Sequence, residues 1–178
     1  TAALERATGM PARDYANREL LGPLAGEVPY WRPDARGLAM GGNDAYLRPR
    51  DLLQLGELYR QGGVHRGRRL LDEAFARTSV APLVATGEPA INHGTLPVRG
   101  YGLCWWALDL EDDDAFAALG HGGQELIVFP RRELVVLLTS RWPGPSSTEH
   151  YQHLLRVLRG LLPAFPRSPG PATAASSG

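Results

Sequence analysis

The chain has 178 residues, 43% of them hydrophobic, which is enough apolar material for one globular domain with a hydrophobic core. The 19 basic and 19 acidic residues cancel to a formal net charge of zero, so the charge gives no reason to expect a nucleic-acid partner or an anionic membrane surface. Every basic residue is arginine, and the lack of lysine removes a whole class of catalytic bases.

Processing and compartment signals are few. Cys104 is the single cysteine, which excludes an intramolecular disulfide and a multi-thiolate zinc site. No apolar run approaches the roughly 20 residues that a membrane helix needs. The chain opens at Thr1 inside a helix-like pattern, without an initiator Met or a signal peptide, so we expect the natural amino terminus to lie upstream. The sequence therefore predicts no compartment.

The first part of the chain is predicted to be mainly helical. Residues 1–21 form two helical pieces that are broken at Gly9, and Pro11 opens the second piece. Residues 22–50 are rich in glycine and proline, which predicts an irregular connection. A helix follows over 51–61, with Asp51 suited to its positive end and an apolar stripe made of Leu52, Leu55, Leu58 and Tyr59. A short helix is predicted over 72–80.

From Gly100 onward the pattern changes to that of strands. Residues 101–108 and 115–119 are predicted strands around an acidic turn over 109–114, and 124–129 and 134–140 form a second pair. The apolar run over 134–138 predicts a strand that is buried on both faces. A helix over 148–162 presents one apolar stripe that covers the sheet, namely Tyr151, Leu154, Leu155, Leu158 and Leu161.

This order of elements predicts an α+β fold in which an antiparallel sheet has flanking helices. We expect one domain portion over 1–163. The low-complexity segment over 164–178 is predicted to be a disordered tail.

Four segments, in order, carry a resemblance to a known family. They are ATGMPARDYANRELLGPL, RPRDLLQLGELYRQGGVHRGRRLL, YGLCWW and GHGGQELIVFPRRELVVLLTSRWP. The stretch from Leu4 to Leu162 resembles the carboxy-terminal half of the β-lactamase-related serine hydrolases, which include class C β-lactamases, esterases, DD-peptidases and nylon-oligomer (aminohexanoate-dimer) hydrolases. The paired tryptophans and the TSRWP ending resemble the last branch most. The resemblance implies a partial β-lactamase/transpeptidase-like fold whose amino-terminal catalytic elements are missing.

The motif that carries chemistry is His121-Gly122-Gly123-Gln124, because the family bears Lys-Thr-Gly or His-x-Gly at a strand edge. By resemblance His121 orients substrate beside the nucleophile, and the backbone N–H of Gln124 is an oxyanion donor. Gly122 and Gly123 let the substrate approach the strand closely. The alternative is a plain turn between two strands. If the resemblance holds, His121 is partly exposed, the Gln124 N–H is unpaired, and the next residue, Glu125, faces the opposite side.

Two tryptophans are further candidates for substrate binding. Trp105 and Trp106 could line an acyl or amide pocket, and core packing is an equally open alternative for each.

The family's nucleophile and base are absent from this sequence. Both belong to an S-x-x-K motif, whose spacing puts serine and lysine on one helix face, and a chain without lysine cannot contain it. Tyr15-Ala16-Asn17 spells the class C Tyr-x-Asn motif. It follows Thr8-Gly9-Met10 here, whereas the family's motif comes before such a turn, so Tyr15 is predicted to be structural.

No metal site or cofactor is predicted. His150 and His153 share a helix face and Asp112, Asp113 and Asp114 cluster, but no third ligand has a recognisable spacing, so an exposed helix face and a solvated turn are preferred.

Two functions remain open. One is a fragment of a serine hydrolase for a small ester, amide or β-lactam, inactive alone and partnered by the amino-terminal half of its own domain. The other is a non-catalytic domain of the same fold that binds a ligand or is a remnant.

Overall fold

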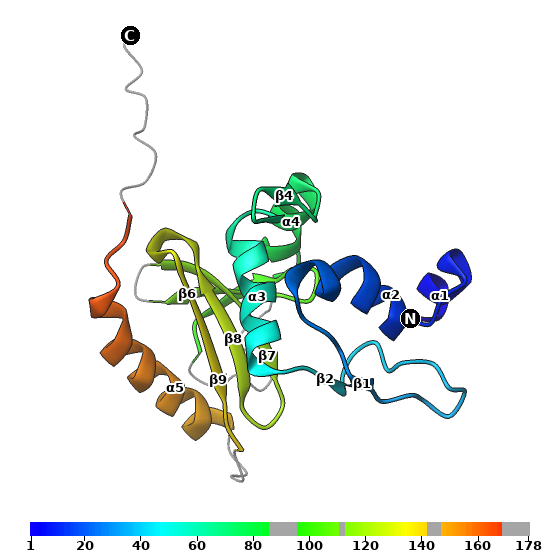
Figure 1. Cartoon of the computed structure of the whole chain (residues 1–178). Coiled ribbons are helices and arrows are strands. Elements are labelled where there is room, and N and C mark those ends of the chain that lie inside the picture. Colours follow the sequence, from blue (N-terminus) through cyan, green and yellow to red (C-terminus); the bar gives the residue numbers. More distant parts are fainter. Residues whose placement is uncertain (86–95, 111–112, 142–146, 169–178) are drawn as a thin grey trace. The chain divides into compact units, whose positions relative to one another are not determined.

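The computed structural model describes residues 1–85, 96–110, 113–141 and 147–168, which fall into two compact units, Thr1–Asp72 and Glu73–Gly178. Figure 1 traces both units along the chain. None of the helices in these described ranges has the length and apolar character of a membrane span.

The first unit begins with the helix break that the sequence predicts. Helix α1 (Ala2–Thr8) ends at Gly9, whose φ of 67° is left-handed and whose N–H donates to the Glu5 carbonyl at 2.8 Å. Helix α2 (Ala12–Ala16) continues as a π-helical turn (Asn17–Leu21) and a 3-10 turn (Gly22–Leu24). The predicted pair of helical pieces over 1–21 is confirmed.

Helix α3 (Pro49–Arg60) confirms the helix predicted over 51–61. Asp51 lies in its first turn, only 4% exposed, and accepts hydrogen bonds from Arg48 Nε at 3.0 Å and from the Glu27 N–H at 3.3 Å. Its carboxylate thus stabilises the positive helix end and also fixes an adjoining loop.

Two short hairpins complete the first unit. Strand β1 (Tyr30–Trp31) pairs with β2 (Ala45–Tyr46), and β3 (Val64–His65) pairs with β4 (Arg68–Arg69), both antiparallel. The segment over 22–50 is therefore less irregular than predicted. Strands of two residues are too short to produce the alternation by which a strand is recognised.

The second unit holds helix α4 (Glu73–Val80) and a five-stranded antiparallel sheet. The sheet order β5-β6-β7-β8-β9 follows the chain and forms a meander. Its strands are β5 (Val98–Tyr101), β6 (Trp106–Leu110), β7 (Asp113–Gly120), β8 (Gln124–Phe129) and β9 (Leu134–Thr139). The predicted single sheet over 115–120, 124–129 and 134–140 is confirmed.

Helix α5 (Ser147–Leu161) lies along one face of this sheet, as predicted (Figure 1). Its apolar residues join one core cluster with the strand residues that point to the same face. The helical members are Tyr151, Leu154 and Leu158, and the strand members include Leu108, Ala117, Ile127 and Phe129. A fully buried leucine such as Leu154, 1% exposed, contributes about 1.5–3 kcal/mol.

Two strand predictions need correction. The strand predicted over 101–108 is split between β5 and β6, because Cys104 has a left-handed φ of 67° and Gly102 lies too close to the Ser79 carbonyl for any Cβ. Strand β9 was predicted to be buried on both faces. It is the edge strand of the sheet, and Leu134–Leu138 are only half-buried. The centre of the predicted acidic turn lies outside the described residues.

A buried ion cluster links Arg167 to the sheet. Asp113, 1% exposed, accepts from Arg132 Nε at 2.5 Å and from Arg167 Nε at 2.9 Å. The N–H of Ser168 donates to the Arg131 carbonyl at 2.6 Å. The disordered tail predicted from residue 164 is therefore wrong for residues 164–168, and residues 169–178 lie outside the described ones.

Candidate functional site

The turn between β7 and β8 contains the predicted motif. The strand register pairs Gly120 with Gln124, which leaves His121, Gly122 and Gly123 as a three-residue loop. Gly122 has a φ of 89° and Gly123 a φ of 101°, backbone conformations that L side chains rarely adopt. The two glycines are therefore required by the turn itself, whatever binds there.

His121 is exposed to solvent at the tip of this turn. The family-based role of its imidazole, to orient a substrate, remains a prediction. The turn carries a titratable side chain that solvent and a ligand can reach.

Gln124 departs from the prediction. The register places it in the sheet interior, opposite Gly120 on one side and Thr139 on the other. Its backbone therefore lies within the ladder, and the expected unpaired N–H is wrong for this structure. The exposed side chain donates from Nε2 to the Ser140 carbonyl at 3.1 Å, which joins the ends of β8 and β9.

Ser140, which follows β9, holds the turn from its other side. Its N–H donates to the Gly123 carbonyl at 2.7 Å, and its Oγ donates to the same oxygen at 3.1 Å. A Cβ added at Gly123 would lie 2.0 Å from Ser140 Oγ, inside contact distance. The sequence predicted this serine only as the last residue of the strand over 134–140, and its contact with the turn was missed.

Beneath the turn lies a buried acid–imidazole pair that the sequence analysis also missed. Glu125, 1% exposed, and His150, 9% exposed, meet at 2.5 Å between Oε1 and Nε2. Glu125 faces away from the side of Gln124, as strand alternation predicts. His150 was expected on an exposed helix face, which is wrong, whereas His153 is exposed. Strand parity was the available signal, because Glu125 shares its face with Ile127 and Phe129.

The electrostatics of this pair follow from its burial. Burial raises the pKa of Glu125, and the hydrogen bond and charge of His150 oppose that rise. Burial, and then the nearby Glu125 carboxylate, raise the pKa of Tyr151. The strand neighbours of Glu125 are Leu119 and Leu138, so the sheet offers the carboxyl no charged partner in register.

The two tryptophans make packing contacts. Trp105, 4% exposed, meets Phe116 edge to face with ring centroids 5.1 Å apart. Trp106 lies 4.5 Å from the Tyr101 ring and packs against the core cluster below α5. These contacts match the core-packing alternative that the sequence left open.

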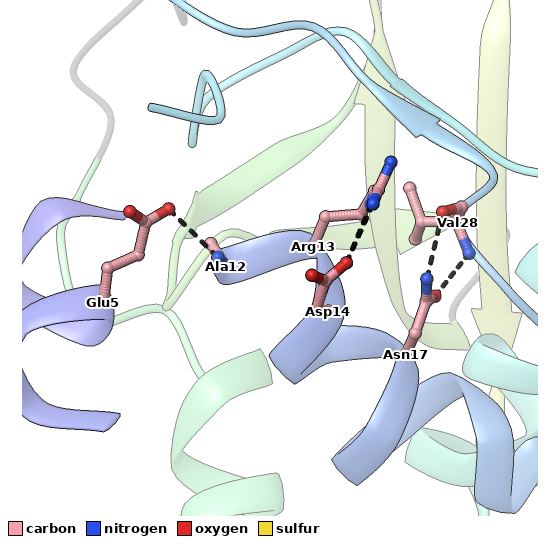
Figure 2. A network of polar contacts seen from close by, with 6 residues as sticks. All are labelled: Glu5, Ala12, Arg13, Asp14, Asn17 and Val28. Carbon is pink, nitrogen blue, oxygen red and sulfur yellow. Dashed lines mark hydrogen bonds and ion pairs between the residues drawn. The ribbon is translucent and has the colours of Figure 1, made fainter. Parts of the chain in front are cut away.

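The Tyr-x-Asn motif lies on α2 and the turn that follows it, and its asparagine has a structural task. Figure 2 shows Asn17 bonded twice to Val28: its Nδ2 donates to the carbonyl at 3.1 Å, and its Oδ1 accepts from the N–H at 2.6 Å. Tyr15 is half-buried, with the Arg18 guanidinium 5.9 Å from its ring centroid. Both residues fit the structural assignment that the order of motifs predicts.

Two surface hollows are lined by residues that do not belong to the motif turn. One of about 190 Å³ lies in the first unit and includes Glu5, Arg13, Asp14 and Trp31 in its lining. The other, about 420 Å³, is lined by Gln152, Leu155, Arg156 and Arg159 on α5. Across the ranges that the structure describes, no three His, Cys, Asp or Glu side chains gather in a way that could hold a metal ion.

The similarity to a curated protein is distant and partial. The chain is 27% identical over 124 residues to the 6-aminohexanoate-dimer hydrolase of Paenarthrobacter ureafaciens, a match that covers 68% of this chain and 31% of that protein. No family model matches the chain.

Solved structures resemble the fold more completely. A candidate 6-aminohexanoate-dimer hydrolase from Bacillus anthracis matches 92% of this chain and 42% of its own, with a TM-score of 0.68 and 21% identity. A candidate β-lactamase from Bacteroides dorei matches 87% of this chain and 54% of its own, with a TM-score of 0.63 and 16% identity.

The chain thus spans between about a third and a half of the length of the relatives that it matches. The sequence match and the two structural matches agree with each other and with the four motif segments. The sequence match supports the resemblance of this chain to the β-lactamase-related serine hydrolases, and the structural matches show that it shares their fold.

Proposed function

We propose that this chain is the carboxy-terminal, substrate-side part of a serine hydrolase that cleaves a small ester, amide or β-lactam through an acyl-enzyme. The observation that carries the proposal is the exposed His121 on a turn whose two glycines leave open backbone beside it. The match to an aminohexanoate-dimer hydrolase supports an amide or ester as the substrate class.

The roles in this proposal are narrower than the resemblance implies. His121 orients the substrate, and Gly122 and Gly123 allow its backbone to approach the strand. We do not assign the oxyanion donor to Gln124, because that role needs an N–H free of the ladder. Trp105 is packed against Phe116, so we do not assign it to the pocket wall either.

The nucleophile and the base come from outside these 178 residues in this proposal. The sequence contains no lysine and hence no S-x-x-K motif. Without an activated serine, no acyl-enzyme can form. We therefore expect the chain alone to be inactive, and a longer protein that adds an S-x-x-K segment to be active.

Strand β9 is the place where we propose that the remaining part of the domain attaches. It is an edge strand of six residues, its Leu-Val-Val-Leu-Leu run is half-buried, and the run carries no charge or proline. Natural proteins usually protect such an edge by pairing or covering it. The amino-terminal half of the same domain is the partner that this proposal requires.

The test compares the chain alone with the longer protein on a chromogenic β-lactam, a nitrophenyl ester and a linear amide dimer. We expect the chain alone to hydrolyse these substrates only at background rates and the longer protein to be active. The His121→Ala variant of the longer protein should have a reduced kcat/KM. Hydrolysis by the chain alone that disappears when one serine or Tyr15 is replaced would contradict the proposal.

A non-catalytic domain of the same fold is the second candidate, and the lack of lysine is the observation that favours it. The coding sequence upstream of Thr1 separates the two. An S-x-x-K motif followed by Tyr-x-Asn or Tyr-x-Ser supports the hydrolase, and an open reading frame without them supports the binding or remnant domain.

A further inference from the structure

Gln124 and Ser140 are bonded to each other across the ends of β8 and β9. The strand register pairs Gln124 with Thr139, so the next opposed residues along the two strands are Gly123 and Ser140. Ser140 donates to the Gly123 carbonyl twice, from its N–H at 2.7 Å and from its Oγ at 3.1 Å. Gln124 Nε2 in turn donates to the Ser140 carbonyl at 3.1 Å. These bonds extend the pairing of the two strands beyond the last regular pair.

Two glycines make room for these two side chains. A Cβ on Gly123 would lie 2.0 Å from Ser140 Oγ, so the hydroxyl occupies the space that a side chain at position 123 would need. A Cβ on Gly120 would lie 3.2 Å from both Cβ and Oε1 of Gln124. The Gln124 side chain therefore packs closely against the end of β7 and is also bonded to Ser140, so it connects the ends of three strands.

The bonds act on the part of the turn that carries His121. Gly123 has a φ of 101°, and glycine has more backbone conformations available to it than any other residue. The two hydrogen bonds to its carbonyl restrict this freedom, and its N–H closes the turn on the Gly120 carbonyl at 3.3 Å. His121 lies between these two glycines, in a loop of three residues. The position of His121 relative to the sheet therefore depends on how firmly Gly123 is held.

We propose that Ser140 and Gln124 are positioning residues for the motif turn: Ser140 fixes the Gly123 carbonyl, Gln124 fixes Ser140, and together they hold His121 where a substrate reaches it. The effect on the turn is a property of this chain, whereas the effect on hydrolysis rests on the function proposed above. Gln124 acts here through its side chain, and not through the backbone N–H that the family resemblance implied.

NMR spectroscopy of the isotope-labelled 178-residue chain at one fixed pH tests the effect on the turn. Ser140→Ala removes the hydroxyl, and Gln124→Met removes the amide donor at nearly unchanged size. Each variant should shift the amide and imidazole resonances of His121. Thr139→Ala is the matched control, because it removes the neighbouring exposed hydroxyl, and it should leave the His121 resonances unchanged. Ser140→Thr keeps a hydroxyl at position 140 and should retain the parent spectrum of His121.

Two results would overturn the proposal. One is a His121 signal that responds to Ser140→Ala or to Gln124→Met no more than it responds to Thr139→Ala. The other is a Ser140→Thr spectrum that matches that of Ser140→Ala, because the hydroxyl would then have no part in holding the turn.

Kinetics of the longer protein test the consequence for hydrolysis. Ser140→Ala should lower kcat/KM about 2- to 10-fold, the effect of one hydrogen bond, and Ser140→Thr should restore it. If Ser140 acts through His121, Ser140→Ala should cost little once His121→Ala is in place, so the two effects are not additive. Full additivity, or an equal loss in Thr139→Ala, would overturn the role in hydrolysis.

The two arms separate this proposal from the function on which it builds. A longer protein without hydrolytic activity would contradict the proposed function alone. The His121 resonances of the 178-residue chain would still decide whether Ser140 and Gln124 position the turn.

Discussion

Replacing Gly123 by alanine tests the geometry of the motif turn most directly. The new Cβ would lie 2.0 Å from Ser140 Oγ and 3.3 Å from His150 Cε1, on a backbone whose φ is 101°. Gly122→Ala is the matched control, because φ is similarly positive at 89° and no atom lies within 4 Å of its added Cβ. Both variants incur the backbone strain, and only Gly123→Ala incurs the collision.

The magnitudes separate the two variants. A left-handed backbone costs an L residue about 1–2 kcal/mol, which applies to both. At Gly123 the collision adds about 1–3 kcal/mol, which includes turning the Ser140 hydroxyl away from the Gly123 carbonyl and losing that hydrogen bond. We therefore expect Gly123→Ala to be less stable than Gly122→Ala by about 1–3 kcal/mol.

Urea denaturation followed by circular dichroism measures this difference, and thermal melting should agree. For a unit of about 100 residues, each kcal/mol lowers the melting temperature by roughly 4–8 °C. Adding Ser140→Ala to Gly123→Ala should recover part of the loss, because it removes the colliding atom. Equal stability of the two alanine variants would refute the close approach of Ser140 to Gly123.

Three further predictions concern stability. Burial raises the pKa of Glu125 above 4.5, so the contribution of this residue to folding stability falls as the pH rises above that value. Glu125→Gln should therefore flatten the pH dependence of the unfolding free energy between pH 4 and 8, as measured by urea denaturation. Burial alone would raise the pKa of Asp113, but its two arginine partners lower it. Asp113→Asn should therefore reduce the free energy of unfolding by about 3–5 kcal/mol near neutral pH, and by less as the pH falls through the lowered pKa. Asn17→Ala leaves the Val28 N–H without its 2.6 Å acceptor and should cost about 1–3 kcal/mol by thermal denaturation, whereas Tyr15→Phe should be neutral.

The elements with a strong periodic pattern were predictable. The stripe of Tyr151, Leu154 and Leu158 placed α5 on the sheet, because the 3.6-residue period shows which face must be covered. The hairpin between β8 and β9 was also predicted correctly. Its four-residue connection runs from Pro130 to Glu133, which has a left-handed φ of 51°.

The features that escaped prediction depend on contacts between distant residues. The run over 134–138 looks equally apolar in a central strand and in an edge strand, so only strand order shows that β9 is exposed. Gln124 was expected to have a free N–H, but register is set by the turn that joins its strand to β7. His150 looked exposed because its carboxylate partner Glu125 lies 25 residues earlier in the chain.

The Asp113 cluster has a consequence for how the protein is made. Asp113 begins β7, and its two arginine partners lie 19 and 54 residues later in the chain. During synthesis Arg132 leaves the ribosome 35 residues before Arg167. The two-arginine site of Asp113 can therefore form only after residue 167 has emerged, later than all five strands of the sheet.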